Sequence, residues 1–483
     1  MLFFSFDFAV FFLTVFFIYW LFPKKYFYQQ NIFIVVANYF FYCWWDWQFG
    51  ILLLFLTSLT FFVSIEISKT ENERQKRLWL ILVGSLLIGA LCYFKYLNFF
   101  ISSFTELVTI FGFPINSATL KIILPLGISF YTFQCFGYVL DVYWEKVEPT
   151  KDVVQFLAFS SFFPLILSGP VERSTNLLLQ IGKSRHLDYD RIAAGAQLIL
   201  WGLFKKVVIA DNLNWYVNII FKSPSEFDGS TLLLGSAFFM IQLYCDFSGY
   251  SDVAIGSANC LGFDLIKNFN LPFFSKSFSD FWRRWHISLT SWLFEYLYNP
   301  LSFSLRQFKK IGIVISLYVI FFISGLWHGA NWTFIFWGVA HGTLLSLEVL
   351  MKGQTRPAAL MRFKLVELFI AFIKMLGVFL CVVLAAIFFK SNSMQDALLI
   401  FSKILACPYG NIYIGSSSFS FFINVFLVIL LFFIQLFQYH GIFSLNFSVS
   451  KVPVYMRWPG YVFLIIVILM IGRTSNEFIY FQF

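Results

Sequence analysis

Long apolar segments recur along the chain, separated by short polar loops. A helix needs about 20 apolar residues to cross a bilayer, and by that measure the pattern predicts roughly eleven membrane spans, with further segments re-entrant or only partly embedded. A membrane barrel would show short alternating segments instead of continuous apolar runs. We therefore expect an all-α polytopic membrane protein. The apolar segments are residues 8–21, 31–45, 51–67, 78–96, 124–144, 153–167, 191–210, 232–261, 311–326, 332–350, 365–389, 419–438 and 461–471.

Two further segments are expected to lie at the membrane surface. Residues 98–113 are half polar, which is typical of an interfacial helix. Residues 277–300 read SFSDFWRRWHISLTSWLFEYLYNP, and Ser277 with Asp280 forms a capping-box pattern that predicts the start of a helix. Its tryptophans fall on one side and two arginines stand near its start. This helix is therefore expected to lie in the interface or to dip into it.

Basic residues predict the orientation of the chain. Lys24 and Lys25 lie between the first two segments, and the loops at 68–77 and 351–364 are also basic. Because cytoplasmic loops carry an excess of lysine and arginine, we expect these loops in the cytoplasm and the N-terminus outside. The turn around His328 then points away from the cytoplasm. The first segment lacks the basic flank and cleavage site of a signal peptide, so it is expected to be retained as a span.

Composition agrees with this class and excludes others. The chain has 483 residues, of which 59% are hydrophobic and 12% charged, whereas a soluble domain carries about 25% charged residues. The net charge of +9 resides in short loops, so we expect no nucleic-acid partner. Seven scattered cysteines without a C-x-x-C pair indicate neither a disulfide framework nor a metal site. We expect one membrane domain over residues 1–483, with a motif-bearing core at about 121–352.

Two of the five histidines stand in aromatic surroundings. His286 lies in WRRWHISL. His328 lies in LWHGANW, where two apolar segments meet and the glycine and asparagine predict a break between two helices. A titratable group inside a membrane is a functional candidate by default, and a neutral histidine is a good general base. His328 is expected to take a hydroxyl proton while the oxygen attacks an activated acyl group. Donors to the developing oxyanion would be Asn331, backbone N–H groups near Gly329, or His286.

Simpler interpretations stand beside these. His328 can be a structural histidine at a helix turn, and His286 can be an interfacial residue among tryptophans. His341 is expected to be a helix-packing histidine that bonds to a neighbour. His186 and His440 lie near loops and are expected to be solvated.

Intramembrane carboxylates must face the protein interior. Gln242, Asp246 and Tyr250 recur at a spacing of four and share one helix face. Asp246 is expected to line a tunnel or to pair with Arg283 or Arg284. The two arginines are either ordinary cytoplasmic-side charges or a docking point for an anionic donor.

Three stretches together resemble the membrane-bound O-acyltransferase family. They are FWRRWH at 281–286, YCDFSGYSD at 244–252 and SGLWHGANW at 324–332. Within the family, the chain is most similar to the bacterial alginate O-acetyltransferase branch, and the D-alanyl transfer protein of teichoic acid synthesis is a more distant relative. Residues 124–133 and 168–173 also resemble that branch.

The resemblance implies a ring of helices around a central tunnel, with His328 as the essential histidine and His286 as a second one near the cytoplasmic end. It implies transfer of an acyl group, expected to be acetyl, from a cytoplasmic thioester to hydroxyls of an extracytoplasmic polysaccharide or to a partner transferase. Acetyl-coenzyme A or an acyl carrier protein would be the donor substrate, with no bound cofactor. The site would lie in a bacterial inner membrane, and its expected tunnel-lining residues are Trp327, Asn331, Asp246, Tyr250, Arg283 and Arg284.

Other functions are weighed against this one. A transporter of polysaccharide or lipid-linked sugar would also have many spans, but the internal symmetry typical of transporters is not found. A metalloenzyme is disfavoured because no H-E-x-x-H pattern is present. A non-catalytic export scaffold would leave His328 dispensable. We favour the acyltransferase.

Overall fold

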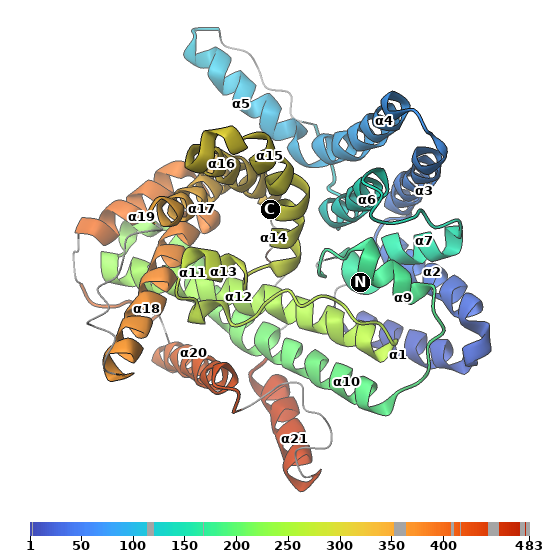
Figure 1. The fold of residues 1–483 in the computed structure, drawn as a ribbon. Helices are drawn as coiled ribbons and strands as arrows, with labels where there is room; N and C mark the ends of the chain where they lie inside the picture. Colours follow the sequence, from blue (N-terminus) through green and yellow to red (C-terminus); the bar gives the residue numbers. More distant parts are fainter. Residues whose placement is uncertain are drawn as a thin grey trace. The chain divides into compact units, whose positions relative to one another are not determined.

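The described residues fold entirely into helices and loops, as expected, in a computed structural model (Figure 1). The structure describes residues 1, 3–113, 120–167, 169–351, 364–406, 410–415, 417–442, 454–473 and 479. Ser168, in the stretch 168–173, and most of the basic loop 351–364 lie outside the described residues.

Eight helices in the described ranges are long and apolar enough to cross a membrane, or nine if one bent pair is counted as a single span. The bent pair is α1 (Phe6–Leu21) with α2 (Phe27–Cys43), which meet at 111°. The expected count of roughly eleven is not confirmed, because several apolar segments form helices too short for a crossing. The long helices are α3 (Trp47–Lys69), α4 (Glu73–Leu91) with α5 (Leu97–Ile110), α10 (Tyr189–Leu203) with α11 (Asp211–Lys222), α12 (Gly229–Cys260), α16 (Lys309–His328), α17 (Trp332–Met351), α18 (Lys364–Lys390) and α20 (Ser418–Tyr439).

The remaining helices are shorter. They are α6 (Ile128–Tyr143), α7 (Val153–Ser160), α8 (Phe163–Ile166), α9 (Leu179–Ile181), α13 (Phe278–Trp282), α14 (Ile287–Leu293), α15 (Asn299–Ser304), α19 (Met394–Ala406) and α21 (Val454–Ile471). Among the described residues, four π-helical stretches adjoin or connect helices. They are η2 (Cys92–Tyr96), η3 (Ser174–Leu178), η4 (Phe204–Ala210) and η7 (Phe294–Tyr298). Such π-helical stretches are often found at functional sites.

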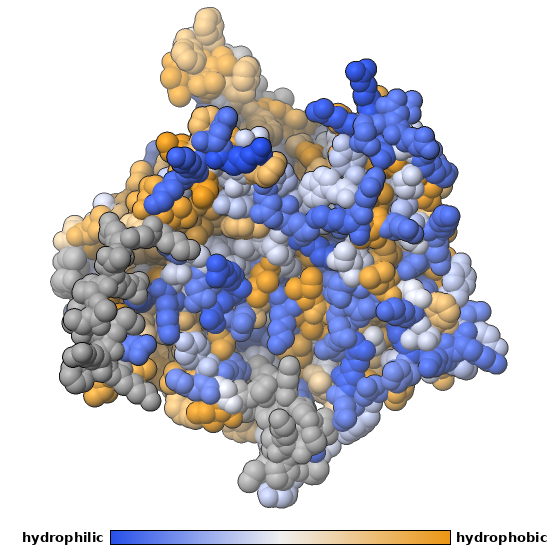
Figure 2. All heavy atoms as spheres, in the orientation of Figure 1, coloured by the Kyte–Doolittle hydropathy of each residue, from blue (hydrophilic) through white to orange (hydrophobic). Residues whose placement is uncertain are grey.

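The segment at 98–113 differs from the separate surface helix that we expected. It forms α5, which continues α4 through the π-helical stretch η2, so that Glu73–Ile110 qualifies as one candidate span of 38 residues. None of the residues of α5 is buried. In Figure 2, α5 is covered by hydrophobic residues, whereas the turn between α3 and α4 is hydrophilic.

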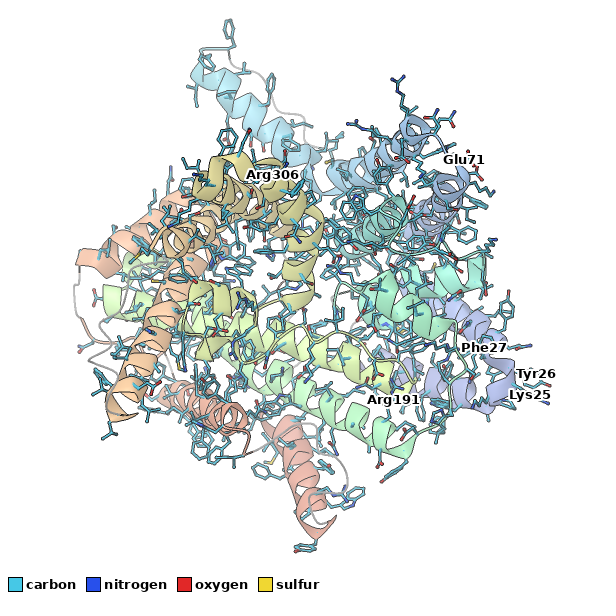
Figure 3. The ribbon with its side chains drawn as sticks, viewed as in Figure 1. Lys25, Tyr26, Phe27, Glu71, Arg191 and Arg306 are labelled. Carbon is cyan, nitrogen blue, oxygen red and sulfur yellow. The ribbon has the colours of Figure 1, made fainter. Side chains whose placement is uncertain are left out.

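Residue contacts group the chain into two compact units. The first unit comprises residues 1–199 and 251–266, and the second comprises residues 200–250 and 267–483. In the first unit, exposed polar residues mark the bends between helices, such as Lys25 and Tyr26 between α1 and α2 and Glu71 between α3 and α4 (Figure 3). Both histidine motifs lie in the second unit. The single domain over 1–483 and its core at 121–352 stay predictions.

Candidate active site

The hairpin of α16 and α17 places His328 at a helix break, as the sequence predicted. His328 is the last residue of α16, and α17 begins four residues later at Trp332. The side-chain oxygen of Asn331 accepts a hydrogen bond from the Thr333 N–H (3.1 Å), which supports the first turn of α17. The two helices approach so closely at Gly325 that a Cβ added there would lie 2.4 Å from the carbonyl oxygen of Phe334.

A second break, which the sequence did not predict, places His286. Ser277 caps a helix as expected by accepting the Asp280 N–H (3.1 Å), but that helix, α13, ends at Trp282. His286 takes a left-handed conformation (φ 43°), which costs a non-glycine residue on the order of 1–3 kcal/mol, and α14 begins after it. The expectation of one helix over 277–300 is therefore wrong.

The loop at 268–270 holds this break open. The Ile287 N–H donates to the Asn268 carbonyl (2.9 Å), and the Asn270 N–H donates to the Arg284 carbonyl (2.9 Å). These bonds replace those that a continuous helix would make. A break fixed by residues far away in the sequence cannot be read from the local pattern around His286.

The side chain of Asn268 fixes the tautomer of His286. Asn268 Oδ1 lies 3.0 Å from His286 Nδ1, and it also accepts from the Ser288 hydroxyl (2.8 Å) and backbone N–H (3.4 Å). The backbone donor identifies this Asn268 atom as oxygen, so Nδ1 of His286 carries the hydrogen. Asn268 was not among the predicted site residues, and nothing in its local sequence signals it.

His286 is therefore a neutral acceptor. Burial lowers its pKa to about 3, and only 1% of its surface is exposed. With Nδ1 donating to Asn268, Nε2 presents a lone pair, and this atom has no hydrogen-bond partner among the described residues. The neutral ring cannot donate through Nε2, so His286 is not the oxyanion donor considered above.

His286 and His328 lie close together, and we refer to them as the histidine pair. Their ring centroids are 6.5 Å apart, and Trp327 lies beside both, at 5.9 Å from His286 and 5.0 Å from His328. Trp337 and Phe389 contact the His328 ring edge-on at 4.9 and 5.3 Å. His328 is 3% exposed. The structure thus brings together both predicted histidines and one predicted lining residue, Trp327, in a buried aromatic setting.

The other three histidines divide as follows. His341 is buried, with its ring 5.0 Å from Trp282 and 4.9 Å from Trp337. Its Nδ1 has no hydrogen-bond partner within the described part of the chain, in contrast to the expected bond to a neighbour. His186 and His440 are exposed, as expected.

Asp246 forms an ion cluster with Lys206 and Asp211, which corrects the expected pairing with Arg283 or Arg284. Lys206 Nζ lies 2.6 Å from Asp246 and 2.8 Å from Asp211, and all three side chains are almost completely buried. The expected partners lie elsewhere, because Arg284 pairs with Asp280 (2.8 Å) and Arg283 is exposed.

The ion cluster and His286 lie against different sides of α12. Phe247, the residue after Asp246, contacts the His286 ring at 4.6 Å, while Asp246 faces η4, which carries Lys206. Tyr250 is buried on α12, and Asn331 lies at the turn after His328. Of the predicted tunnel-lining residues, Trp327 contacts both rings of the histidine pair, and Asn331 lies three residues beyond His328.

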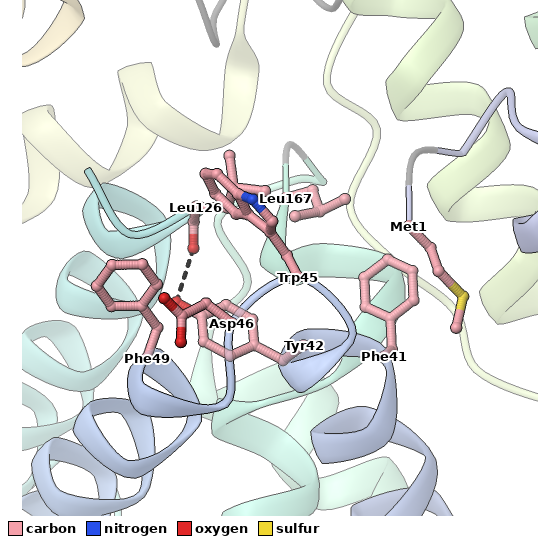
Figure 4. Close-up of a pocket in the computed structure, with 8 residues that line it drawn as sticks. All are labelled: Met1, Phe41, Tyr42, Trp45, Asp46, Phe49, Leu126 and Leu167. Carbon is pink, nitrogen blue, oxygen red and sulfur yellow. Dashed lines mark hydrogen bonds between the residues drawn. The ribbon is translucent and has the colours of Figure 1, made fainter. Parts of the chain in front are cut away.

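Two further features do not belong to this site. A small pocket in the first unit lies between aromatic side chains of α2 and α3 and the loop before α6, where the Tyr42 hydroxyl donates to the Leu126 carbonyl (2.9 Å; Figure 4). It contains no histidine. Within the described ranges, no group of three or more histidine, cysteine, aspartate or glutamate residues is arranged to hold a metal ion.

Comparisons with known proteins agree with the motifs. The model of the membrane-bound O-acyltransferase family matches residues 149–390, which include both members of the histidine pair and Asp246. The chain is 36% identical to the probable alginate O-acetylase AlgI of Pseudomonas aeruginosa over 388 residues, covering 80% of this chain and 71% of the relative.

Two relatives carry other names. The chain is 33% identical to the peptidoglycan O-acetyltransferase of Helicobacter pylori over 404 residues, covering 78% of this chain and 73% of the relative. It is 29% identical to the teichoic acid D-alanyltransferase of Bacillus subtilis over 232 residues, covering 46% of this chain and 58% of the relative. The chain therefore belongs to the membrane-bound O-acyltransferase family and is a multi-pass membrane O-acyltransferase.

Proposed function

We propose that the protein transfers an acetyl group from a cytoplasmic thioester to hydroxyls of an extracytoplasmic polysaccharide, with His328 as general base. The observation that carries this proposal is the histidine pair, which combines two buried imidazoles 6.5 Å apart at the end of a candidate span. The names of the relatives support the acceptor class, because alginate, peptidoglycan and teichoic acid are polymers built with sugar or polyol units.

In this mechanism His328 takes the proton from the acceptor hydroxyl as its oxygen attacks the thioester carbonyl. The tetrahedral intermediate collapses with cleavage of the carbon–sulfur bond, and the thiolate takes the proton from the His328 imidazolium. A positioned base of this kind contributes on the order of 10²–10⁴-fold in rate. His286 contributes a fixed lone pair at Nε2, which accepts a hydrogen bond from a substrate and orients it.

The surroundings of the histidine pair suit this chemistry. The rings of Trp327, Trp337 and Phe389 exclude water from His328, and a low dielectric strengthens electrostatic stabilisation of the transition state. Arg283, exposed three residues before His286, is placed to contact an anionic donor such as the phosphates of coenzyme A.

We further propose that the protein lies in a bacterial inner membrane with its N-terminus outside, since basic loops favour the cytoplasm. The donor is acetyl-coenzyme A or an acyl carrier protein loaded with the acyl group. An extracytoplasmic acetyltransferase that receives the acyl group before the polysaccharide is the alternative end point.

Proteoliposomes with the purified protein test the proposal. Coenzyme A that carries a labelled acetyl group is supplied on one side of the membrane, and a different hydroxyl-bearing polysaccharide is placed on each side. The label on each polymer is measured over time, and we expect label on the polymer opposite the donor. Thioester loss without polymer label points to a missing partner transferase, and repetition with a loaded carrier protein decides the donor. If unlabelled polysaccharide crosses the membrane equally well with and without a thioester, the result would instead support a transporter function.

A further inference from the structure

Ser324 is a buried serine that lies one helical turn before His328, and its hydroxyl has no partner among the described residues. It lies on α16, its side chain is 1% exposed, and its Oγ makes no hydrogen bond to any residue the structure describes. Residues four apart on a helix share one face, so Ser324 and His328 point in the same direction. A buried polar atom without a partner in a native protein calls for an explanation.

Several other buried helical hydroxyls in the described residues are bonded within their own helix, whereas Ser257 and Ser346, like Ser324, have no partner there. Ser316, two turns earlier on the same helix, donates to the Gly312 carbonyl (2.7 Å), and Thr60 and Ser64 likewise donate to carbonyls four residues before them (2.7 Å each). Helical serines and threonines commonly satisfy their hydroxyl by this local bond. The hydroxyl of Ser324 therefore retains a hydrogen that no helix carbonyl accepts.

The neighbours of Ser324 place it against the segment that carries His286. Phe321, one turn before Ser324, contacts the Trp282 ring at 4.9 Å, and His328, one turn after it, lies 6.5 Å from His286. Ser324 thus sits between two contacts that join the same face of α16 to the same broken segment. Its side chain therefore lies on the face of α16 that carries His328.

The donors expected from the sequence are less suited to an oxyanion. The Gly329 N–H already donates to the Gly325 carbonyl (3.4 Å). Asn331 is only half-buried, three residues beyond His328, with its side-chain oxygen held by the Thr333 N–H. His286 presents an acceptor at Nε2. Ser324 is a buried donor on the histidine face that remains available.

We propose that Ser324 is a further catalytic residue, whose hydroxyl donates a hydrogen bond to the thioester carbonyl oxygen as it becomes an oxyanion. This inference rests on the proposed function. When the acceptor oxygen attacks, its proton goes to His328 and the carbonyl electron pair moves onto oxygen, where Ser324 stabilises it. When the carbon–sulfur bond breaks, that pair re-forms the carbonyl, the thiolate takes the proton from His328, and Ser324 is unchanged.

The test is Ser324→Ala in the labelled-thioester assay, with kcat and KM measured separately. Loss of one oxyanion donor lowers kcat on the order of 10²–10³-fold, with little change in KM, because the bond strengthens in the transition state. Ser324→Thr keeps a hydroxyl at the same position and is expected to restore most of the lost kcat.

Two matched controls isolate the position from the residue type. Ser316→Ala removes a buried hydroxyl from the same helix, but one that is already bonded to a carbonyl. Ser346→Ala removes another buried hydroxyl without a partner among the described residues, nine residues beyond Trp337 on α17 and so about 13 Å further along that helix. Both are expected to keep wild-type kcat.

Several results would overturn the inference. These are an unchanged kcat in Ser324→Ala, a change confined to KM, or equal losses in Ser324→Ala and Ser324→Thr. Melting temperature guards against misfolding, since removal of an unbonded hydroxyl should leave it unchanged or raise it. If His328→Ala is inactive while Ser324→Ala is normal, only this inference fails, whereas an active His328→Ala removes the proposed function itself.

Discussion

The histidine pair and the ion cluster are both buried polar regions of the second unit, but they differ in whether their polar atoms have bonding partners. In the ion cluster, Lys206 lies within 2.8 Å of both Asp211 and Asp246, and the Ile479 N–H adds a bond to Asp246 (2.9 Å). Around the histidine pair, His286 Nε2 and the Ser324 hydroxyl have no partner in the described part of the chain.

This difference separates structural from chemical roles. Burial of a charge is costly unless it is paired, so a satisfied cluster is the expected arrangement for groups that hold helices together. A polar atom that stays unbonded in a buried place is destabilising and calls for an explanation, and beside two buried histidines a substrate that completes its bonding is one. We therefore assign stability to the ion cluster and chemistry to the histidine pair.

The largest effect that tests this comparison is on stability. Lys206→Met leaves two buried carboxylates without their cation, and breaking a buried ion pair in this way costs about 3–5 kcal/mol. We expect a large fall in the melting temperature of the purified protein. Lys69→Met, which removes an exposed partner of Glu66, is the matched control and should change little. A stable but inactive Lys206→Met variant would give the ion cluster a chemical role and break the comparison.

Some of this picture was accessible from the sequence, and some was not. Apolar runs predicted the membrane class, glycine and asparagine predicted the break after His328, and Ser277 predicted the start of α13. The break before His286 was missed because it depends on backbone bonds to Asn268, 18 residues away. The partner of Asp246 was missed because the sequence does not show that Lys206, in the π-helical stretch η4, faces α12.

A smaller effect, on rate alone, concerns Asn268. Asn268→Ala removes the acceptor that fixes the His286 tautomer. We therefore expect kcat to fall at least about tenfold, which is less than the full contribution of a positioned acid or base. Asn268→Asp should introduce an acid limb in the pH–rate profile, because a carboxylate beside Nδ1 stabilises the protonated ring and raises the pKa of His286. Identical pH profiles in wild type and Asn268→Asp would contradict a positioning role for Asn268.

A further effect is the pH dependence of stability. The pKa of His286 is about 3 in the folded protein and about 6.5 in an unfolded chain. Between these values the unfolded state binds more protons, so the stabilisation from neutral His286 is complete above pH 6.5 and is lost as pH falls toward 3, by about 1.4 kcal/mol per pH unit. His286→Gln should therefore lose less melting temperature than wild type between pH 6.5 and 4.5.

The exposed His440 provides the control for this measurement. His440→Gln should follow the wild-type slope of melting temperature against pH. Equal slopes for wild type and His286→Gln would show that burial does not keep His286 neutral.

Catalysis by His328 is tested most directly by comparing label transfer from acetyl-coenzyme A, or from a loaded carrier protein, in wild type and His328→Ala. Both proteins are purified in nanodiscs, and melting temperature is recorded for each. We predict that His328→Ala remains folded and loses transfer by on the order of 10²–10⁴-fold. Near-normal transfer by a folded His328→Ala variant would contradict the assignment of His328 as the general base.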